Sequence, residues 1–173
     1  MHRSGHARTL LLVGPLSMVL FFTPPLRAFE RQFHLGGGLG AARPSGDYEL
    51  GPALGIHAAY GLTDAFDLRL ELQGSRSDLG TLPVSFYGTR LGLAYKIDVM
   101  RLIPYAGVSA GGFAIAWEGG SLVRPSGGAY FGLDYGVSPH FGLGVFVNGD
   151  FIVVNPAVIV TSVLLRAEYR TDF

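Results

Sequence analysis

The feature that most constrains this chain is an alternation of apolar and polar residues with a period of two. Over Phe66–Gln73, written FDLRLELQ, aromatic or aliphatic side chains occupy every second position, and charged or amide side chains occupy the positions between them. Successive side chains of a β-strand point to opposite faces, whereas a helix repeats about every 3.6 residues. The segment is therefore predicted to be a strand with one apolar and one polar face.

The same alternation recurs along the chain and predicts eight strands. Polar, turn-rich loops over residues 43–49, 74–83, 118–125 and 149–156 alternate with tight turns near residues 64, 100 and 139. An even number of antiparallel strands, with short turns at one end and longer loops at the other, is typical of transmembrane β-barrels. The predicted strands are Arg31–Ala42, Leu50–Leu62, Phe66–Gln73, Val84–Ile97, Ile103–Trp117, Gly127–Val137, Phe141–Val147 and Ala157–Phe173, and the faces of the fifth remain unassigned.

Composition narrows the class of protein further. The mean hydropathy of +0.35 is high for a soluble domain, yet no segment after residue 28 has the roughly 18 unbroken apolar residues of a spanning helix. The chain has no cysteine, which excludes disulfides and thiolate metal sites. Its formal net charge is zero, so nucleic acid is not an expected partner. High apolarity without a spanning helix favours spanning strands.

The N-terminal segment is predicted to be a secretory signal peptide over residues 1–28, which leaves a barrel domain over residues 29–173. Arg3 and Arg8 precede the apolar run of Thr9–Phe22, and a small residue, Ala28, closes the segment. An uncleaved membrane anchor is the alternative. The run is short for an anchor and contains Pro15, which favours cleavage and export.

The alternation fits two barrels: a soluble carrier with an apolar interior, or a membrane barrel with a polar one. Glycine fills many positions of the charged rows, as the crowded lumen of an eight-stranded barrel requires. Each Arg or Lys placed near the middle of the lipid would cost about 2–4 kcal/mol. We therefore predict a lumen network of paired charges that comprises His57, Asp67, Arg69, Glu71, Arg90, Lys96, Asp134, Arg166, Glu168 and Arg170.

Aromatic residues of the apolar rows cluster beside the predicted short turns. Such rings suit a membrane interface, which is apolar on one side and wet on the other. The predicted interface aromatics are Tyr60, Phe66, Tyr95, Tyr135, Phe141, Tyr169 and Phe173.

The end of the chain, LLRAEYRTDF, resembles the C-terminal strand of bacterial outer-membrane β-barrels, although Thr171 departs from the usual pattern. YGLTDAFDLRLEL (Tyr60–Leu72) and YKIDVMRLIPYAGVSAG (Tyr95–Gly111) are similar to strand–turn–strand units of small OmpA/OmpX-like barrels. The resemblance implies outer-membrane lipid as the surroundings, a monomer, and recognition by the barrel assembly machinery through the strand that ends at Phe173. It implies no peptidoglycan-binding domain.

Candidate catalytic and ligand-binding residues are sparse. His34 and His57 are predicted on adjacent strands, with Glu71 opposite His57, and His140 is predicted in a turn. The strands contain no His-x-Ser pair of the kind expected for a lipid A hydrolase, and Gly36–Gly40 is not followed by the helix of a phosphate site. We therefore expect no catalytic residues, cofactor or metal.

The expected function is a structural or surface-contact role through four extracellular loops without large apolar patches, and without an open pore. A narrow porin-like channel, a lipid A-modifying enzyme and a soluble lipocalin-like carrier remain alternatives.

Overall fold

The computed structural model describes residues 31–97 and 101–172. The predicted signal peptide and Phe173 lie outside these residues. Within the described ranges, no helix has the length and apolarity that would be needed to cross a bilayer.

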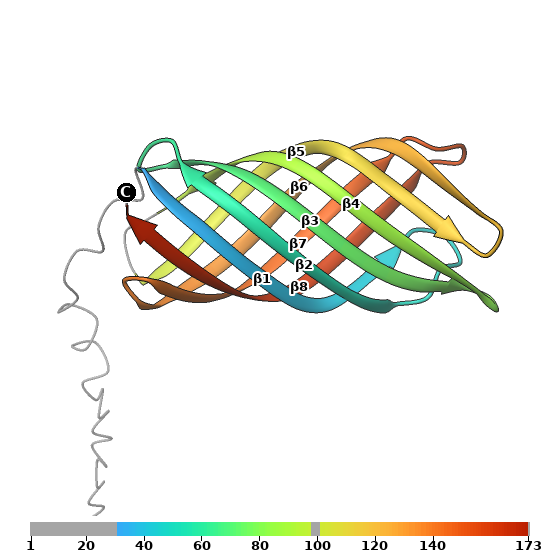
Figure 1. Ribbon diagram of the computed structural model, residues 1–173, viewed down its shortest axis with the longest axis horizontal. Coiled ribbons are helices and arrows are strands. Elements are labelled where there is room, and N and C mark those ends of the chain that lie inside the picture. Colours follow the sequence, from blue (N-terminus) through green and yellow to red (C-terminus); the bar gives the residue numbers. More distant parts are fainter. Residues whose placement is uncertain (1–30, 98–100, 173) are drawn as a thin grey trace, which may run out of the picture.

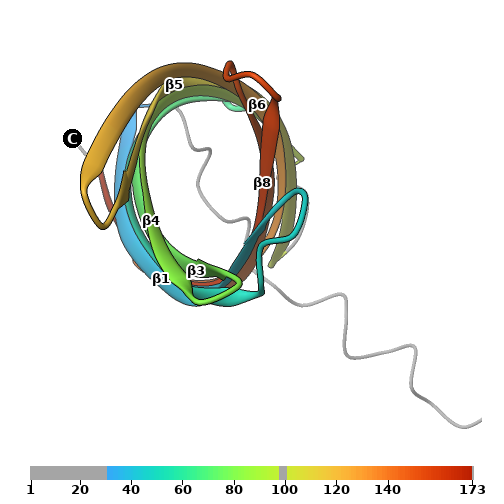
Figure 2. The ribbon, with the colours of Figure 1, turned by 90° about the vertical axis from the view of Figure 1, so that its right-hand side faces the viewer.

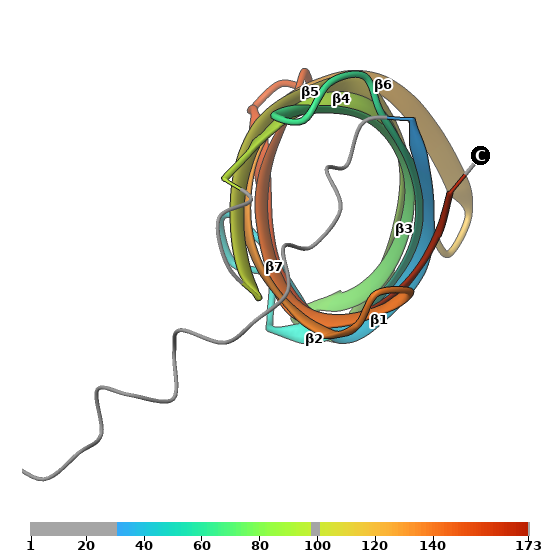
Figure 3. The same ribbon diagram turned by 90° about the vertical axis from the view of Figure 1, so that its left-hand side faces the viewer.

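The chain forms one closed, wholly antiparallel barrel in which each strand pairs with its sequence neighbours and β1 pairs with β8 (Figures 1, 2 and 3). The predicted fold class is therefore confirmed. The strands are β1 (Gln32–Pro44), β2 (Gly51–Gly61), β3 (Phe66–Leu79), β4 (Leu82–Lys96), β5 (Leu102–Trp117), β6 (Gly120–Ser138), β7 (Phe141–Ile152) and β8 (Val158–Asp172).

The barrel has two distinct ends. We call the end where β1 begins and β8 finishes the proximal end; it also carries the connections β2–β3, β4–β5 and β6–β7 (Figure 3). The distal end, on the right of Figure 1 and facing the viewer in Figure 2, carries the other four connections.

The distal end differs from its prediction, because β3, β6 and β7 run further than their sequence patterns indicate. The predicted polar loops over residues 74–83 and 118–125 are wrong: β3 and β4 pair as far as Leu79 and Leu82, and β5 and β6 as far as Trp117 and Gly120. Gly80 and Gly119 adopt φ angles of 63° and 93°, which glycine tolerates, and so close two-residue turns. Polar side chains in these segments did not prevent pairing, because the ladder bonds are made by the backbone.

On its β6 side, the hairpin of β5 and β6 extends beyond the end of β7 (Figure 1). Pairing between β6 and β7 begins at Ser126 and Ile152, so the stretch Gly120–Pro125 pairs in register with β5 alone. Past this point, the Val153 amide still donates a hydrogen bond to the carbonyl of Pro125, over 3.1 Å. The first part of β6 therefore leaves one strand edge open.

The two faces of the wall carry opposite kinds of side chain. The exterior is dominated by exposed aliphatic and aromatic residues, such as Leu39 (71% exposed) and Leu165 (68%). The charged rows of β3, β4 and β8 point into the lumen, where they are buried. The structure also assigns the two faces of β5, which the sequence left unassigned. The buried, lumen-facing side chains of this strand are Ile103, Tyr105, Phe113 and Ile115.

Candidate functional site

The proximal half of the lumen is organised around one buried carboxylate, Glu168 on β8. Nδ1 of His34 lies 3.1 Å from one of its oxygens, and Nε2 of His57 lies 2.9 Å from the other. Arg170 Nε donates to the same group over 2.9 Å, and Arg69 Nη2 lies 3.8 Å away. Two imidazoles and two guanidinium groups therefore converge on a single acid.

This arrangement corrects the expected partner of the histidines. His57 pairs in register with Glu71 across β2 and β3, as the hairpin predicts. However, the carboxylate that both His34 and His57 contact is Glu168, which comes from the far end of the sequence. Because the barrel closes β1 against β8, residues distant along the chain meet here, and hairpin register alone could not show it.

A second ion pair lies beside the first group. Lys96 on β4 contacts the carboxylate of Asp67 on β3, and its Nζ lies 3.4 Å from Nδ1 of His34. All three side chains are buried. A buried charge needs an opposite charge and hydrogen bonds to offset its lost hydration, and here each charge has one.

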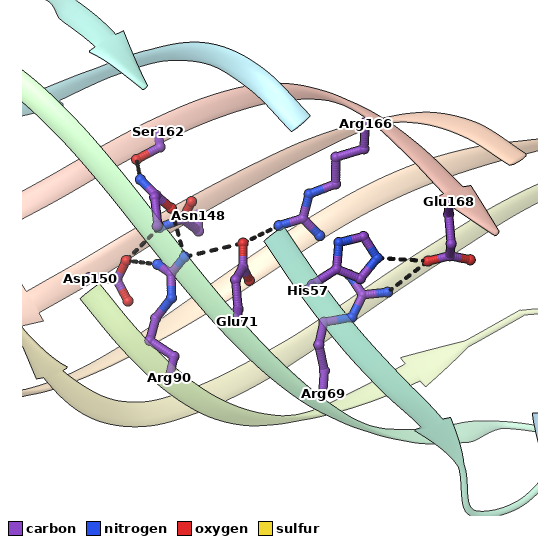
Figure 4. Close-up of polar contacts among 10 residues, drawn as sticks. His57, Arg69, Glu71, Arg90, Asn148, Asp150, Ser162, Arg166 and Glu168 are labelled. Atoms are coloured by element: carbon purple, nitrogen blue, oxygen red, sulfur yellow. Dashed lines mark hydrogen bonds and ion pairs between the residues drawn. The ribbon is translucent and has the colours of Figure 1, made fainter. Parts of the chain in front are cut away.

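The middle of the lumen is organised around Glu71 and Arg90. Glu71 contacts the guanidinium group of Arg166, and one of its oxygens lies 3.2 Å from Arg90 Nη2. Arg90 also contacts Asp150 on β7. Figure 4 shows the resulting chain of contacts, which runs from Asp150 through Arg90 and Glu71 to Arg166.

Uncharged polar side chains complete this middle group. Arg90 Nη2 donates to the Gln73 side-chain oxygen over 2.6 Å, and Gln73 Nε2 donates to the hydroxyl of Ser162 over 2.5 Å. The side-chain amide of Asn148 donates to Asp150. The network therefore joins β3, β4, β7 and β8 across the lumen (Figure 4).

Several members of this network were not predicted from the sequence, although most of them continue the period-two alternation of their strands. Asn148 and Asp150 continue the alternation of Gly142, Gly144 and Phe146, but the predicted strand ended at Val147 and Asp150 fell in the predicted loop over residues 149–156. Gln73 stood at the predicted end of its strand, on the same face as Glu71. Extending the period-two pattern until a glycine turn interrupts it would have recovered these side chains. Ser162 shares the alternation of Arg166, Glu168 and Arg170 on the last strand, but no local sequence pattern pairs it with Gln73.

Aromatic side chains fill the spaces between these charges. The guanidinium carbon of Arg166 lies 3.2 Å from the centre of the Phe146 ring, and that of Arg69 lies 4.6 Å from the centre of the Tyr105 ring. Such cation–π contacts stabilise a desolvated guanidinium group. Lumen glycines make room for the rings: a Cβ atom on Gly88 would lie 2.7 Å from the ring of Phe113.

Towards the distal end, the lumen becomes apolar. Phe86 is 1% exposed and packs edge-on against Tyr48 of the β1–β2 connection, with ring centroids 5.6 Å apart. We call the buried side chains at this level the apolar layer; they are Val84, Phe86, Ile115, Ile152 and Val160. The buried hydroxyls of Ser75, Ser77 and Ser126 lie at the same level, among these apolar side chains.

The remaining predicted residues take the following places. Asp134 is buried on the lumen side of β6. The predicted interface aromatics that the structure describes are exposed on the exterior, in the last residues before or the first residues after proximal turns. Phe66 and Tyr95 contact one another at 5.4 Å between centroids, and His140 stacks on Tyr169 at 6.3 Å. Phe173 lies outside the described residues.

The arrangement of the lumen side chains is suited to charge pairing more than to catalysis. Each histidine in it is directed at Glu168, beside two arginines. Among residues 31–97 and 101–172, no group of three or more acidic or histidine side chains is placed to hold a metal ion. The cationic side chains around Glu168 would in any case oppose binding of a metal cation there.

No protein-family model and no curated protein sequence matches this chain. Solved structures do match it. Neisserial surface protein A (NspA) superposes with a TM-score of 0.68 at 19% identity, over 82% of this chain and 97% of that one. The chain has the fold of small outer-membrane β-barrels. OprG from Pseudomonas aeruginosa matches over 87% of this chain and 100% of its own, with a TM-score of 0.67 at 13% identity.

Two other outer-membrane barrels match less closely. Ail, the attachment invasion locus protein of Yersinia pestis, has a TM-score of 0.54 at 17% identity, over 82% of this chain and 99% of its own. The N-terminal barrel domain of Pseudomonas aeruginosa OprF has a TM-score of 0.56 at 14% identity, over 82% and 98% of the two chains. At such identities the likeness concerns the fold, and function has to be argued from the residues of this chain.

Proposed function

We propose that this chain is a closed outer-membrane β-barrel that acts at the cell surface through its distal end and does not conduct ions. The observation that carries this proposal is the reversal of the two faces: the lumen is charged and filled, while the exterior is apolar and exposed. In water that exterior would be a large uncovered apolar surface, which soluble monomers avoid. In lipid, such an apolar exterior is the outer surface expected of a membrane barrel.

The orientation follows from the two ends. Bacterial outer-membrane barrels have short turns on the periplasmic side. The exterior aromatics of the proximal end, among them Tyr60, Phe66 and Tyr169, would then lie at the inner interface, where aromatic rings are favoured. The distal end would face the outside of the cell. Export through the signal peptide of residues 1–28 and assembly through the strand that ends at Phe173 belong to this proposal, as does the monomeric state.

The absence of conductance follows from the contents of the lumen. Glu168 and its four partners occupy the proximal half, and the apolar layer occupies the distal half. Eight-stranded barrels have an interior just wide enough for side chains to fill it. An ion crossing this barrel would have to break several charge pairs and then pass the apolar side chains at the level of Phe86, where the polar groups include buried serine hydroxyls such as those of Ser75 and Ser77.

A role at the surface is favoured by what protrudes there. The β3–β4 and β5–β6 hairpins and the connections over residues 45–50 and 153–157 form the distal end. Ail has been solved in complex with a heparin analogue, sucrose octasulfate. The distal end of this chain carries exposed charges of both signs, with the acids Asp47, Glu49, Asp78 and Glu118 beside the bases Arg43, Arg76 and Arg124.

Two measurements test the proposal together. Outer-membrane fractions would be run on gels with and without boiling, and purified protein would be inserted into planar lipid bilayers. We expect recovery in the outer membrane, a heat-dependent change in mobility, and no discrete current steps. A soluble periplasmic protein without a mobility change would contradict the membrane assignment, and regular current steps would contradict the closed lumen.

A further inference from the structure

The lumen-facing rows continue past the apolar layer as apolar side chains, and these form a rim around the distal opening. Leu79, Leu82 and Trp117 occupy the same alternation as the lumen-facing residues of β3, β4 and β5. Leu122 and Val158 do so on β6 and β8. The same face that carries charge at the proximal end therefore carries hydrocarbon on nearly every strand of the distal end.

These side chains enclose a cavity of about 660 Å³, which we call the distal cup. Its volume lies within the range of roughly 300–1,000 Å³ that is usual for small-molecule sites. Val84 and Ile115 belong both to the cup and to the apolar layer beneath it, so the cup has an apolar floor. The lining residues are Ser45, Gly46, Tyr48, Leu79, Leu82, Val84, Ile115, Trp117, Glu118, Leu122, Val154, Asn155, Pro156, Ala157 and Val158.

The apolar lining of the cup is not explained by the membrane. Lipid covers the exterior of a barrel, whereas the cup opens inward and, in the proposed orientation, above the bilayer. Leu82 is nevertheless 54% exposed and Trp117 is 44% exposed. An apolar concavity left open to water at one end of a protein marks a site for an apolar ligand. This step rests on the proposed function, because it needs the distal end to lie outside the lipid.

The charges of the lining define the head of such a ligand. Among the lining residues, Glu118 is acidic and none is basic. Glu118 follows directly after Trp117, the single tryptophan of the chain. A carboxylate beside an indole ring attracts a cationic group both by charge and by cation–π contact. An anionic head would meet Glu118 without a compensating cation from the lining.

We propose that the distal cup binds the hydrocarbon chain of a single-chain amphiphile whose cationic head lies near Glu118 and Trp117. The floor of the cup is closed by Phe86 and its neighbours in the apolar layer. The site therefore captures its ligand at the surface and does not pass it through the barrel. Long-chain amines and quaternary ammonium compounds are the chemical class that fits.

The emission of Trp117 provides a direct measurement, since it is the single tryptophan of the chain and the nanodisc scaffold is chosen to be free of tryptophan. The full chain would be reconstituted in lipid nanodiscs and titrated with dodecyltrimethylammonium, hexyltrimethylammonium and dodecyl sulfate. We expect a saturable change with dodecyltrimethylammonium, and affinities about tenfold weaker or worse for the other two probes. The short chain loses buried hydrocarbon, and the sulfate loses the favourable head contact.

Matched variants separate the cup from general partitioning into lipid. Val158→Asn puts an amide into the cup, and Val123→Asn makes the same change at an exposed position that does not line it. We expect Val158→Asn to weaken binding of dodecyltrimethylammonium about tenfold or more and Val123→Asn to leave it unchanged. Glu118→Gln should keep binding of the chain but lose the preference for the cationic probe over dodecyl sulfate.

Several outcomes would overturn the inference. A linear response without saturation, equal in both valine variants, would show that the probe only partitions into the bilayer. Tighter binding of dodecyl sulfate would contradict the assignment of the head. Protein that fails to insert into nanodiscs, with no heat-dependent mobility change, would refute the proposed function itself. Inserted, heat-modifiable protein without saturable binding would refute the cup alone.

Discussion

The two ends of the lumen are built from the same eight strands and the same alternation, yet they are chemically opposite. At the proximal end, the inward positions hold Glu168, the two histidines, Lys96 and Asp67, all buried and in contact with opposite charges or hydrogen-bonding partners. At the distal end, the inward positions hold the apolar layer and then the distal cup. The exterior is apolar over most of the wall, and near the distal end it also carries the exposed side chains of Arg43, Arg76 and Asp78.

Only one of the two ends therefore has a lining that the requirements of folding explain by themselves. Charges sealed in a narrow lumen need partners, and the proximal end supplies them. The apolar layer excludes water as a protein core does. The rim of the distal cup does neither, because its hydrocarbon is exposed. The four predictions below test whether the proximal charges and the apolar layer maintain the fold while the rim is dispensable for it.

The largest effect is expected from the carboxylate on which the proximal charges converge. Glu168→Gln leaves Arg69 and Arg170 buried without their counter-charge and should lower the free energy of unfolding by about 3–5 kcal/mol. Denaturant titration of the refolded barrel measures this loss. Glu49→Gln, which is exposed, is the control and should change stability by less than about 0.5 kcal/mol. Equal effects of the two changes would show that the buried network is not needed.

The apolar layer should be nearly as sensitive. Phe86→Ala leaves a cavity in the filled lumen and is expected to cost about 3–5 kcal/mol in the same titration. Phe151→Ala, at an exterior position that is 48% exposed, removes the same atoms where lipid can fill the space. It should cost clearly less. A larger loss at Phe151 would mean that the exterior, and not the lumen, carries the packing.

Overpacking at the boundary between charges and rings should have a moderate effect. Gly88→Ala places a methyl group 2.7 Å from the ring of Phe113 and is expected to destabilise the barrel by about 1–3 kcal/mol. At Gly149, an added Cβ would meet no atom within 4 Å, so Gly149→Ala serves as the control. If both substitutions were neutral, the lumen would be looser than its geometry indicates.

The smallest effect is expected at the rim. Leu82→Asn should change the free energy of unfolding by less than about 0.5 kcal/mol, since its side chain is already exposed. Val84→Asn, two residues further into the same strand, buries an amide without a partner and should cost about 1–3 kcal/mol. A large loss at Leu82 would make the rim part of the core and remove the main argument for a ligand site.

Period-two alternation made the fold predictable, because the wall of a barrel repeats one rule along every strand. Eight residues of sequence placed Asp67, Arg69 and Glu71 on one face, and the glycines of the charged rows together with the cost of charge in lipid assigned that face to the lumen. The hairpin register of His57 was also correct. The lengths of β3 and β6 were not predictable from side-chain polarity. Arg76, Asp78 and Arg124 read as loop residues, although the backbone around them still pairs.

The contacts between lumen side chains were harder to predict from the sequence than the set of side chains that point into the lumen. Glu168 meets His34 and His57 because the first and last strands join, which brings together positions more than a hundred residues apart. No local pattern encodes which of several lumen acids faces a given base. The distal cup was missed for a related reason: Leu79, Leu82, Leu122 and Val158 are scattered single residues in the sequence, and only ring closure gathers them.

The open edge of β6 bears on whether the barrel can pair with other chains. A strand that pairs on one side only is a template for strands of other molecules, and an unprotected edge invites aggregation. In the stretch Gly120–Pro125, Arg124 and Pro125 stand directly before Ser126, the first residue of β6 that pairs with β7. A charged side chain and a proline, which lacks an amide hydrogen, are among the devices by which natural strand edges discourage further pairing. The open edge of this hairpin therefore carries features that discourage pairing with other copies of the chain.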